Sequence, residues 1–237
     1  MNYDTTDFIN ELHDLNIDLS QNQLKQFLMY YEMLIEKNKV MNLTAITEFN
    51  EVVKKHFVDS LSLNKVINLK QSLSVLDLGT GAGFPGIPLK IAFPDLKITL
   101  ADSLNKRLVF LNEVISSLNL KNIETVHGRA EDLARMECYR ENFDLCVSRA
   151  VANLSTLSEY CLPFVKIGGL FISYKSAECD KEIDNAKHAI FLLGGKMRDI
   201  YKFELGDSGR AFVTILKEKS CSKKYPRKAG MPAKTPL

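Results

Sequence analysis

The fold of this chain is decided by the stretch Val75-Leu76-Asp77-Leu78-Gly79-Thr80-Gly81-Ala82-Gly83-Phe84-Pro85-Gly86. A short apolar run ends with an acid, three glycines follow at alternate positions, and a helix-like pattern begins after Phe84 and Pro85. This order is typical of an α/β protein that exposes bare backbone to a nucleotide-like ligand at the carboxyl end of its first parallel strand.

Downstream of residue 72, apolar runs of strand length alternate with helical periodicity. The pattern predicts strands at residues 75–78, 97–101, 123–127, 143–148, 169–175, 196–204 and 210–217, and helices at 84–92, 104–119, 130–136, 153–162 and 178–193. Strict alternation predicts a mostly parallel sheet with helices on both faces. Only residues 205–209, with Gly206, Asp207 and Gly209, separate the last two strands, so we expect an antiparallel last strand. The fold class is therefore α/β, with a mostly parallel seven-stranded sheet.

Residues 1–70 show no strand pattern and read as helical. Ser20 and Gln23 match a capping box at the start of an amphipathic helix. Another helical stretch runs from Glu48 to Val66, with a break expected near His56. We therefore predict an N-terminal helical region at 1–70, a ligand-binding domain at 71–219 and a basic tail at 220–237.

The composition is that of a globular protein, with 46% hydrophobic and 25% charged residues and a net charge of +2 over 237 residues. Residues 217–237 contain seven Lys or Arg and one acid, a local balance of +6. This basic tail favours an anionic partner such as nucleic acid, although a solvated terminus is the plain alternative. The five cysteines are odd in number and contain no C-x-x-C pair, so their pattern indicates neither a disulfide framework nor a zinc site. No signal peptide or membrane span is visible, so we expect a cytoplasmic protein that binds no membrane. A monomer is a separate expectation.

Two ligands compete for the glycine loop. Residues 81–86 formally match the dinucleotide fingerprint G-x-G-x-x-G. Counted from Gly79, the first tight turn, Phe84 stands where a dinucleotide site needs its third glycine, which argues against that ligand. The alternative is S-adenosylmethionine, whose sulfonium and amino groups favour nearby oxygens such as those of Asp77. Residues 77–83 resemble the first motif of class I, Rossmann-like methyltransferases. A turn without a ligand is the least favoured interpretation, because three alternating glycines cost conformational entropy.

Polar residues follow the next three strands. Asp102 ends the second strand and would accept hydrogen bonds from ribose hydroxyls under either ligand. Glu131 follows the third strand, where an acid commonly meets the adenine edge, although an acid in the first helical turn also suits the helix dipole. Arg149 follows the fourth strand and would face the reacting centre, or else form a surface ion pair.

Several further motifs resemble one family, the bacterial small-subunit rRNA methyltransferase G family, also called glucose-inhibited division protein B. They are Asn42-Leu43-Thr44, residues 56–61, Phe84-Pro85-Gly86-Ile87-Pro88-Leu89, Ser148-Arg149-Ala150 and the Pro-Arg-Lys-x-Gly tail that begins at Pro226. The resemblance covers nearly the whole chain and implies S-adenosylmethionine-dependent methylation of guanine N7 in the 530 loop of 16S rRNA. It also implies cofactor contacts from Gly79, Phe84, Ala130, Glu131 and Arg149, to which the physical argument adds Gly81 and Asp102.

Guanine N7 carries an in-plane lone pair and no proton at neutral pH. Its attack on a sulfonium methyl therefore needs alignment rather than a general base, and we expect no catalytic proton acceptor, no metal and structural histidines. The resemblance gives the basic tail a role as well. Contacts to rRNA phosphates are expected from Lys175, Lys223, Lys224, Arg227 and Lys228. A nucleotide-dependent oxidoreductase and a non-catalytic RNA-binding protein remain the rival interpretations.

Overall fold

The computed structural model describes residues 3–149 and 151–237, so Ala150 of the Ser-Arg-Ala motif lies outside the described residues. Its strands are β1 (Ser74–Leu78), β2 (Lys97–Asp102), β3 (Ile123–His127), β4 (Phe143–Arg149), β5 (Val165–Ser176), β6 (Gly195–Leu205) and β7 (Ser208–Lys217). Its helices are α1 (Thr6–Asp14), α2 (Gln21–Met41), α3 (Phe49–Val52), α4 (Asp59–Leu61), α5 (Gly86–Ala92), α6 (Asn105–Ser117), α7 (Ala130–Leu133), α8 (Leu154–Cys161), α9 (Asp180–Leu192) and α10 (Met231–Lys234).

One seven-stranded sheet has the order β3-β2-β1-β4-β5-β7-β6. The first five strands pair in parallel, whereas β7 lies between β5 and β6 and is antiparallel to both. The predicted antiparallel last strand is therefore confirmed. Because the strand order reverses between β1 and β4, a crevice opens at the carboxyl ends of the strands, where α/β sheets bind ligands.

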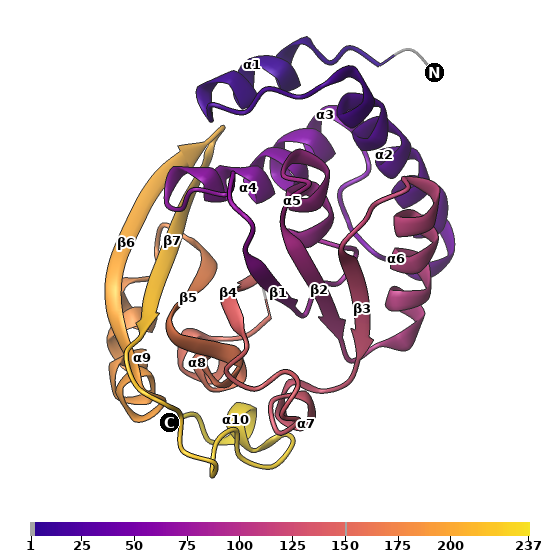
Figure 1. The fold of residues 1–237 in the computed structure, drawn as a ribbon. Coiled ribbons are helices and arrows are strands. Elements are labelled where there is room, and N and C mark those ends of the chain that lie inside the picture. Colours follow the sequence, from indigo (N-terminus) through magenta and orange to yellow (C-terminus); the bar gives the residue numbers. More distant parts are fainter. Residues whose placement is uncertain (1–2, 150) are drawn as a thin grey trace.

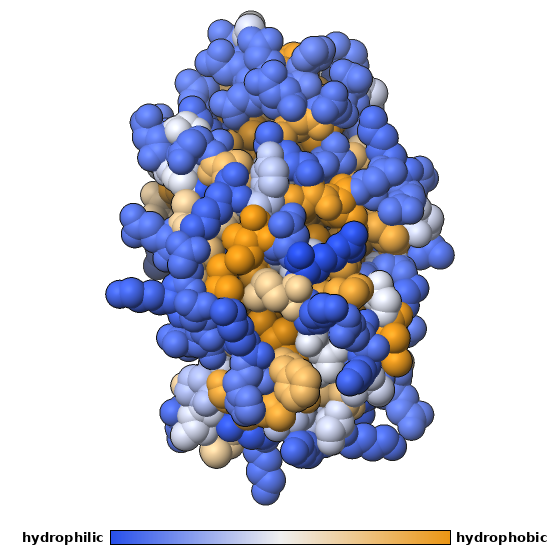
Figure 2. Space-filling model, turned by 90° about the vertical axis from the view of Figure 1, so that its left-hand side faces the viewer, coloured by the Kyte–Doolittle hydropathy of each residue, from blue (hydrophilic) through white to orange (hydrophobic). Residues whose placement is uncertain are grey.

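Helices lie on both sides of the sheet (Figure 1). Two clusters of buried apolar side chains lie between these helices and the strands. Successive side chains of a strand point to opposite faces. In β4, Leu145 and Val147 join the cluster under α5 and α6, while Cys146 joins the cluster under α8 and α9. Figure 2 shows the β6 side of the molecule, where apolar side chains gather near the middle of the surface with polar side chains around them. No helix of the described residues is long and apolar enough to cross a membrane.

The N-terminal helices share the core of the sheet. The capping box is confirmed, since Gln23 N donates to Ser20 Oγ at 3.3 Å and Ser20 N donates to Gln23 Oε1 at 2.9 Å. Gln23 also donates to the carbonyl of Ile91 on α5 at 2.8 Å. Phe8 and Phe27 belong to the same buried cluster as Ile87 and Leu100, so these helices pack directly on the layer that carries the glycine loop.

The third helical stretch is continuous where a break was expected. Between α3 and α4 it widens into a π-helical turn, Val53–Val58, which contains His56. Such turns insert one extra residue into a helix and are frequent at functional sites. The turn keeps the helix intact while Phe57 points to the core and His56 lies between two cavities.

Candidate functional site

A cavity of about 720 Å³ lies at the carboxyl ends of the central strands, and we call it the cofactor pocket. This volume lies in the range of pockets that hold small molecules. The glycine loop, the end of β2, the segment after β3, Arg149 and two residues of the tail all line it. The sequence-predicted residues Gly79, Gly81, Phe84, Asp102, Ala130, Glu131 and Arg149 are therefore brought together.

The loop after β1 exposes backbone to this pocket. Gly79 and Gly81 have φ values of +74° and +61°, a region that favours glycine. A Cβ atom on Gly81 would have only the carbonyl oxygen of Gly79 nearby, at 3.9 Å, so the pocket side is open. Gly81 N donates to Asp102 Oδ2 at 2.9 Å, which ties the loop to the end of β2.

Asp77 supports the loop from behind and does not line the pocket. It is fully buried, and its Oδ2 accepts from Thr80 Oγ1 at 2.7 Å and from Gly86 N at 2.8 Å. Burial raises the pKa of this carboxyl to about 6, against the effect of those hydrogen bonds. Asp77 Oδ2 therefore holds the two ends of the glycine loop together, and the suggestion that this residue offers oxygens to the ligand stays a prediction.

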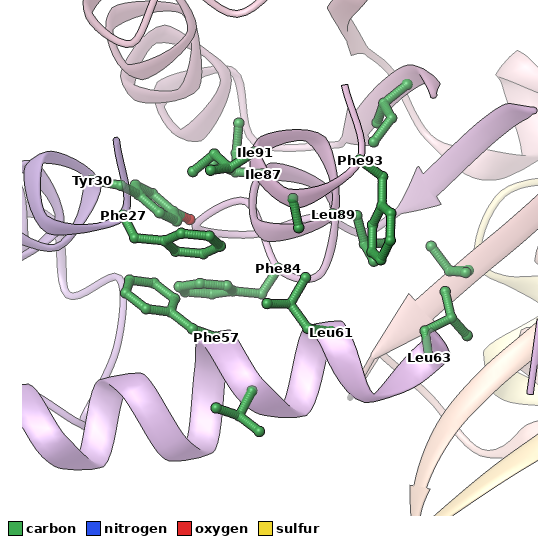
Figure 3. Packing of buried hydrophobic residues seen from close by; sticks show 14 of the residues in the cluster. Phe27, Tyr30, Phe57, Leu61, Leu63, Phe84, Ile87, Leu89, Ile91 and Phe93 are labelled. Carbon is green, nitrogen blue, oxygen red and sulfur yellow. The ribbon is translucent and has the colours of Figure 1, made fainter. Parts of the chain in front are cut away.

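The position of Phe84 also corrects the register argument against a dinucleotide. Its ring points away from the sheet, toward Tyr30, Phe57 and Phe27 (Figure 3). Gly86 makes the close approach between α5 and the sheet, because a Cβ there would lie 2.2 Å from Leu100 Cδ2. Phe84 therefore does not block the helix, and the register of the glycines alone does not decide the cofactor.

Phe84, His56 and Arg149 form a stack at the edge of the cofactor pocket. The His56 and Phe84 ring centroids are 4.6 Å apart at 30°, and the Arg149 guanidinium lies 5.1 Å from the centre of the Phe84 ring. His56 Nε2 lies 2.9 Å from Thr44 Oγ1. Burial, and secondarily the charge of Arg149, lowers the pKa of His56 to about 4. His56 is therefore a neutral ring at physiological pH, and the structural role expected for it stays a prediction.

Arg149 is held in an ion network that the sequence interpretation missed. Its Nη1 donates to Asp59 Oδ2 at 2.8 Å, and Arg210 Nε donates to Asp59 Oδ1 at 3.0 Å. Asp59 is only 3% exposed, so two guanidinium partners offset the cost of burying its charge. The motif of residues 56–61 was noticed for its resemblance, but nothing in it indicated a partner 90 residues away.

The two acidic residues of the pocket are both buried and bonded to backbone. Asp102 Oδ1 accepts from Leu104 N at 2.9 Å and Arg107 Nη1 lies 3.2 Å from Oδ2. Glu131 Oε1 accepts from Gly230 N at 2.9 Å, which brings the tail to the pocket. Carboxylate oxygens accept more than one hydrogen bond. Both residues therefore fit as acceptors for the hydroxyl and amino groups of an adenosine. They line the same pocket as Gly79 and Gly81, which have no side chain to fill the space beside the backbone.

The tail is fastened to the body as an extended segment with one short helix, α10, which the sequence did not predict (Figure 1). Arg227 donates from Nη2 and Nε to the fully buried Glu159, at 2.6 and 2.9 Å, and this raises the pKa of the guanidinium. Thr156 Oγ1 donates to the carbonyl of Pro232 at 3.0 Å. These contacts place Gly230 and Ala233 in the wall of the cofactor pocket.

The five residues predicted to bind RNA have different surroundings. Lys223, Lys224 and Lys228 are exposed on the tail. Arg227 lies against Glu159, so its guanidinium first of all holds the tail in place. Lys175 is largely buried, with Nζ 2.8 Å from the carbonyl of Ala152 and 2.5 Å from Glu182 Oε1. No group of three potential metal ligands occurs within residues 3–149 and 151–237.

The low pKa of His56 makes a prediction about pH. Because the pKa is about 4 in the folded protein and 6.5 for an ordinary histidine, the unfolded chain binds the proton more tightly. The contribution of His56 to stability is therefore complete above pH 6.5 and is lost as the pH falls towards 4. In an NMR titration, the His56 ring signal, assigned by its loss in His56→Gln, should not titrate between pH 8 and about 5.5. A midpoint above pH 6 would contradict this.

Comparison with known proteins places the chain. A family model described as "rRNA small subunit methyltransferase G" (GidB) matches residues 23–210. A protein named ribosomal RNA small subunit methyltransferase G from Lachnoclostridium phytofermentans is 54% identical over 99% of this chain and 98% of its own length. The protein of that name from Clostridium kluyveri is 49% identical over 94% of each chain.

Solved structures show the same fold at low sequence identity. A SAM-dependent methyltransferase from Aquifex aeolicus matches 74% of this chain and 97% of its own, with a TM-score of 0.55 and 18% identity. TYW2 from M. jannaschii, solved with AdoMet, matches 62% of this chain and 70% of its own, with a TM-score of 0.52 and 15% identity. The predicted class I, Rossmann-like fold is confirmed, and the rival interpretation as an oxidoreductase is not supported. The chain therefore belongs to the rRNA small subunit methyltransferase G family, and its cofactor is S-adenosylmethionine.

Proposed function

We propose that this enzyme methylates N7 of a guanine in the 530 loop of 16S rRNA by direct in-line transfer. The observation that carries the activity is the cofactor pocket, in which a glycine cradle, two buried carboxylates and the Phe84–Arg149 stack converge. The target base follows from the family resemblance.

Each predicted cofactor contact has a role in this proposal. The backbone of Gly79 and Gly81 lies against the amino-acid part of the cofactor, and Asp102 accepts hydrogen bonds from the ribose hydroxyls. Ala130 and Glu131 meet the adenine edge. Phe84 and Arg149 border the reacting end, where they exclude water and fix the direction of approach. S-adenosylmethionine supplies a methyl group bonded to a positively charged sulfur.

No residue needs to abstract a proton in this mechanism. The N7 lone pair attacks the methyl carbon while the carbon–sulfur bond breaks, and its electron pair remains on the sulfur. The surroundings support this account, because His56, with a pKa of about 4, is a weak base. Asp102 and Glu131 already accept backbone hydrogen bonds. The enzyme contributes a low-dielectric site in which guanine N7, the methyl carbon and the sulfur are held in line.

The direct test is transfer of a labelled methyl group from S-adenosylmethionine to rRNA that lacks the modification, followed by mapping of the labelled base. We expect label on N7 of one guanine in the 530 loop. Label on cytosine or adenine would contradict the base assignment. Absence of transfer to naked rRNA, 30S subunits and assembly intermediates alike would favour the non-catalytic RNA-binding interpretation.

We further propose that the tail contributes phosphate contacts through its exposed lysines, with Arg227 holding the segment and Lys175 acting deeper in the site. Replacing Lys223, Lys224 and Lys228 by Ala should weaken rRNA binding at low salt. The plot of the logarithm of the binding constant against the logarithm of the salt concentration should become less steep by about 2. Each of the three lost phosphate contacts contributes about 0.7 to this slope on single strands.

The matched control replaces three exposed lysines at the opposite, amino-terminal edge of the parallel strands, namely Lys70, Lys97 and Lys121. It removes the same charge from the protein. Filter binding between 50 and 300 mM salt compares the two triple variants. If the tail variant and the control variant have equal slopes, a specific role for the tail is contradicted. If the slope falls in the tail variant and stays at the wild-type value in the control, that role is supported.

A further inference from the structure

A second cavity, of about 420 Å³, adjoins the cofactor pocket. His56 and Arg149 line both, so the two cavities meet at the stack that borders the reacting end. The second cavity lies at the end of β5, beside the start of β7 and the π-helical turn. None of the sequence-predicted cofactor contacts except Arg149 lines it, so it lies apart from the proposed adenosine site.

Aromatic side chains form one wall of the second cavity. Phe203 and Phe212 stack with ring centroids 5.2 Å apart at 22°, and Tyr174 meets Phe212 edge-on at 4.8 Å. Tyr174 is itself fixed, because its hydroxyl donates to the carbonyl of Ser60 at 2.8 Å. A fixed cluster of aromatic rings of this kind suits a nucleobase, since every base presents a π-face.

The remaining lining residues are strongly cationic. Among the described residues, Lys55, Arg149, Lys175 and Arg210 line the cavity with one acid, Asp59, an excess of three positive charges. Glu51 and Glu182, the partners of Lys55 and Lys175, do not line it. This excess suits the phosphate groups that flank a nucleotide.

We propose that the second cavity receives the target guanosine, unstacked from the rRNA, with its base on the aromatic wall and a flanking phosphate on Arg210 and Lys55. The base then projects past His56 and Arg149 toward the methyl group. Enzymes that modify a base commonly take it out of the stack into such a pocket. This inference rests on the proposed function and adds the residues that position the substrate.

Arg210 is the sharpest residue to test. Its Nε is fixed by Asp59, its side chain is 28% exposed, and it does not line the cofactor pocket. Arg210→Gln should therefore reduce single-turnover methylation of rRNA at least about tenfold, the loss expected for one charged hydrogen bond. Its affinity for S-adenosylmethionine should change less than about twofold. Arg198→Gln, an exposed arginine of β6 outside the cavity, is the control.

The outcomes separate the two proposals. If the wild type transfers methyl to rRNA and Arg210→Gln does so at the same rate, the cavity proposal is overturned while the proposed function stands. If the wild type modifies no rRNA, the proposed function fails, and nucleotide binding then tests the cavity by itself.

That second measurement uses guanosine 5′-monophosphate and ribose 5-phosphate as probes on the full chain, in the presence of S-adenosylhomocysteine. NMR detects the weak affinities expected of fragments. Guanosine monophosphate should shift the Arg210 Nε–H signal and the ring signals of Phe203, and Phe203→Leu should weaken its binding. Equal binding of ribose 5-phosphate would mean a simple phosphate site, and no shift with either probe would mean no nucleotide site; both results overturn the proposal.

Discussion

The packing of Phe84 connects the glycine loop with the N-terminal helices and with Arg149. Its ring is 5% exposed and contacts Tyr30 of α2, Phe57 of the π-helical turn and His56. The guanidinium of Arg149, at the end of β4, lies 5.1 Å from the centre of the same ring and 3.4 Å from His56 Nδ1. A glycine-rich loop has little side-chain surface of its own, so an aromatic residue at its end adds apolar burial that helps to fix its position. Tyr30 adds a hydrogen bond from its hydroxyl to the carbonyl of Ala82 at 2.6 Å.

Buried charge organises the neighbouring half of the site. Asp59 holds Arg149 on one side and Arg210 on the other, so a single carboxylate positions a residue of the cofactor pocket and a residue of the second cavity. Glu159 acts in the same way for the tail by binding Arg227. Burying these charges costs desolvation free energy that the pairing offsets, so removing a partner destabilises the buried carboxylate that it leaves behind.

Local patterns predict the elements of this fold well. The seven strands, the capping box at Ser20 and the hairpin near Gly206 depend on neighbouring residues and are confirmed. The π-helical turn is different, because it depends on tertiary packing. It places Phe57 in the apolar core and the neighbouring His56 at the edge of the two cavities. Periodicity there indicates a break, and the structure instead keeps the helix and adds a residue to one turn.

The site was predictable where it follows strand ends and unpredictable where it depends on distant partners. Asp102 and Arg149 end β2 and β4, so the topology of a parallel sheet brings them together. Asp77 lies on β1 yet faces the loop behind it, because its partners Thr80 and Gly86 bend back over the strand end. Asp59 and Arg210 are 151 residues apart, and no local signal predicts their contact.

We infer that the N-terminal helices hold the glycine loop in its binding conformation through Phe84. Phe57 tests it, because its ring centroid lies 6.2 Å from that of Phe84 and it does not line the cofactor pocket. Calorimetric titration with S-adenosylmethionine should show a dissociation constant raised about tenfold in Phe57→Ala, with the milder Phe57→Leu in between.

Urea unfolding should show Phe57→Ala losing about 3–5 kcal/mol. Phe191→Ala, at a 72% exposed position, should change neither quantity. A folded Phe57→Ala protein that binds S-adenosylmethionine as tightly as the wild type would contradict the account.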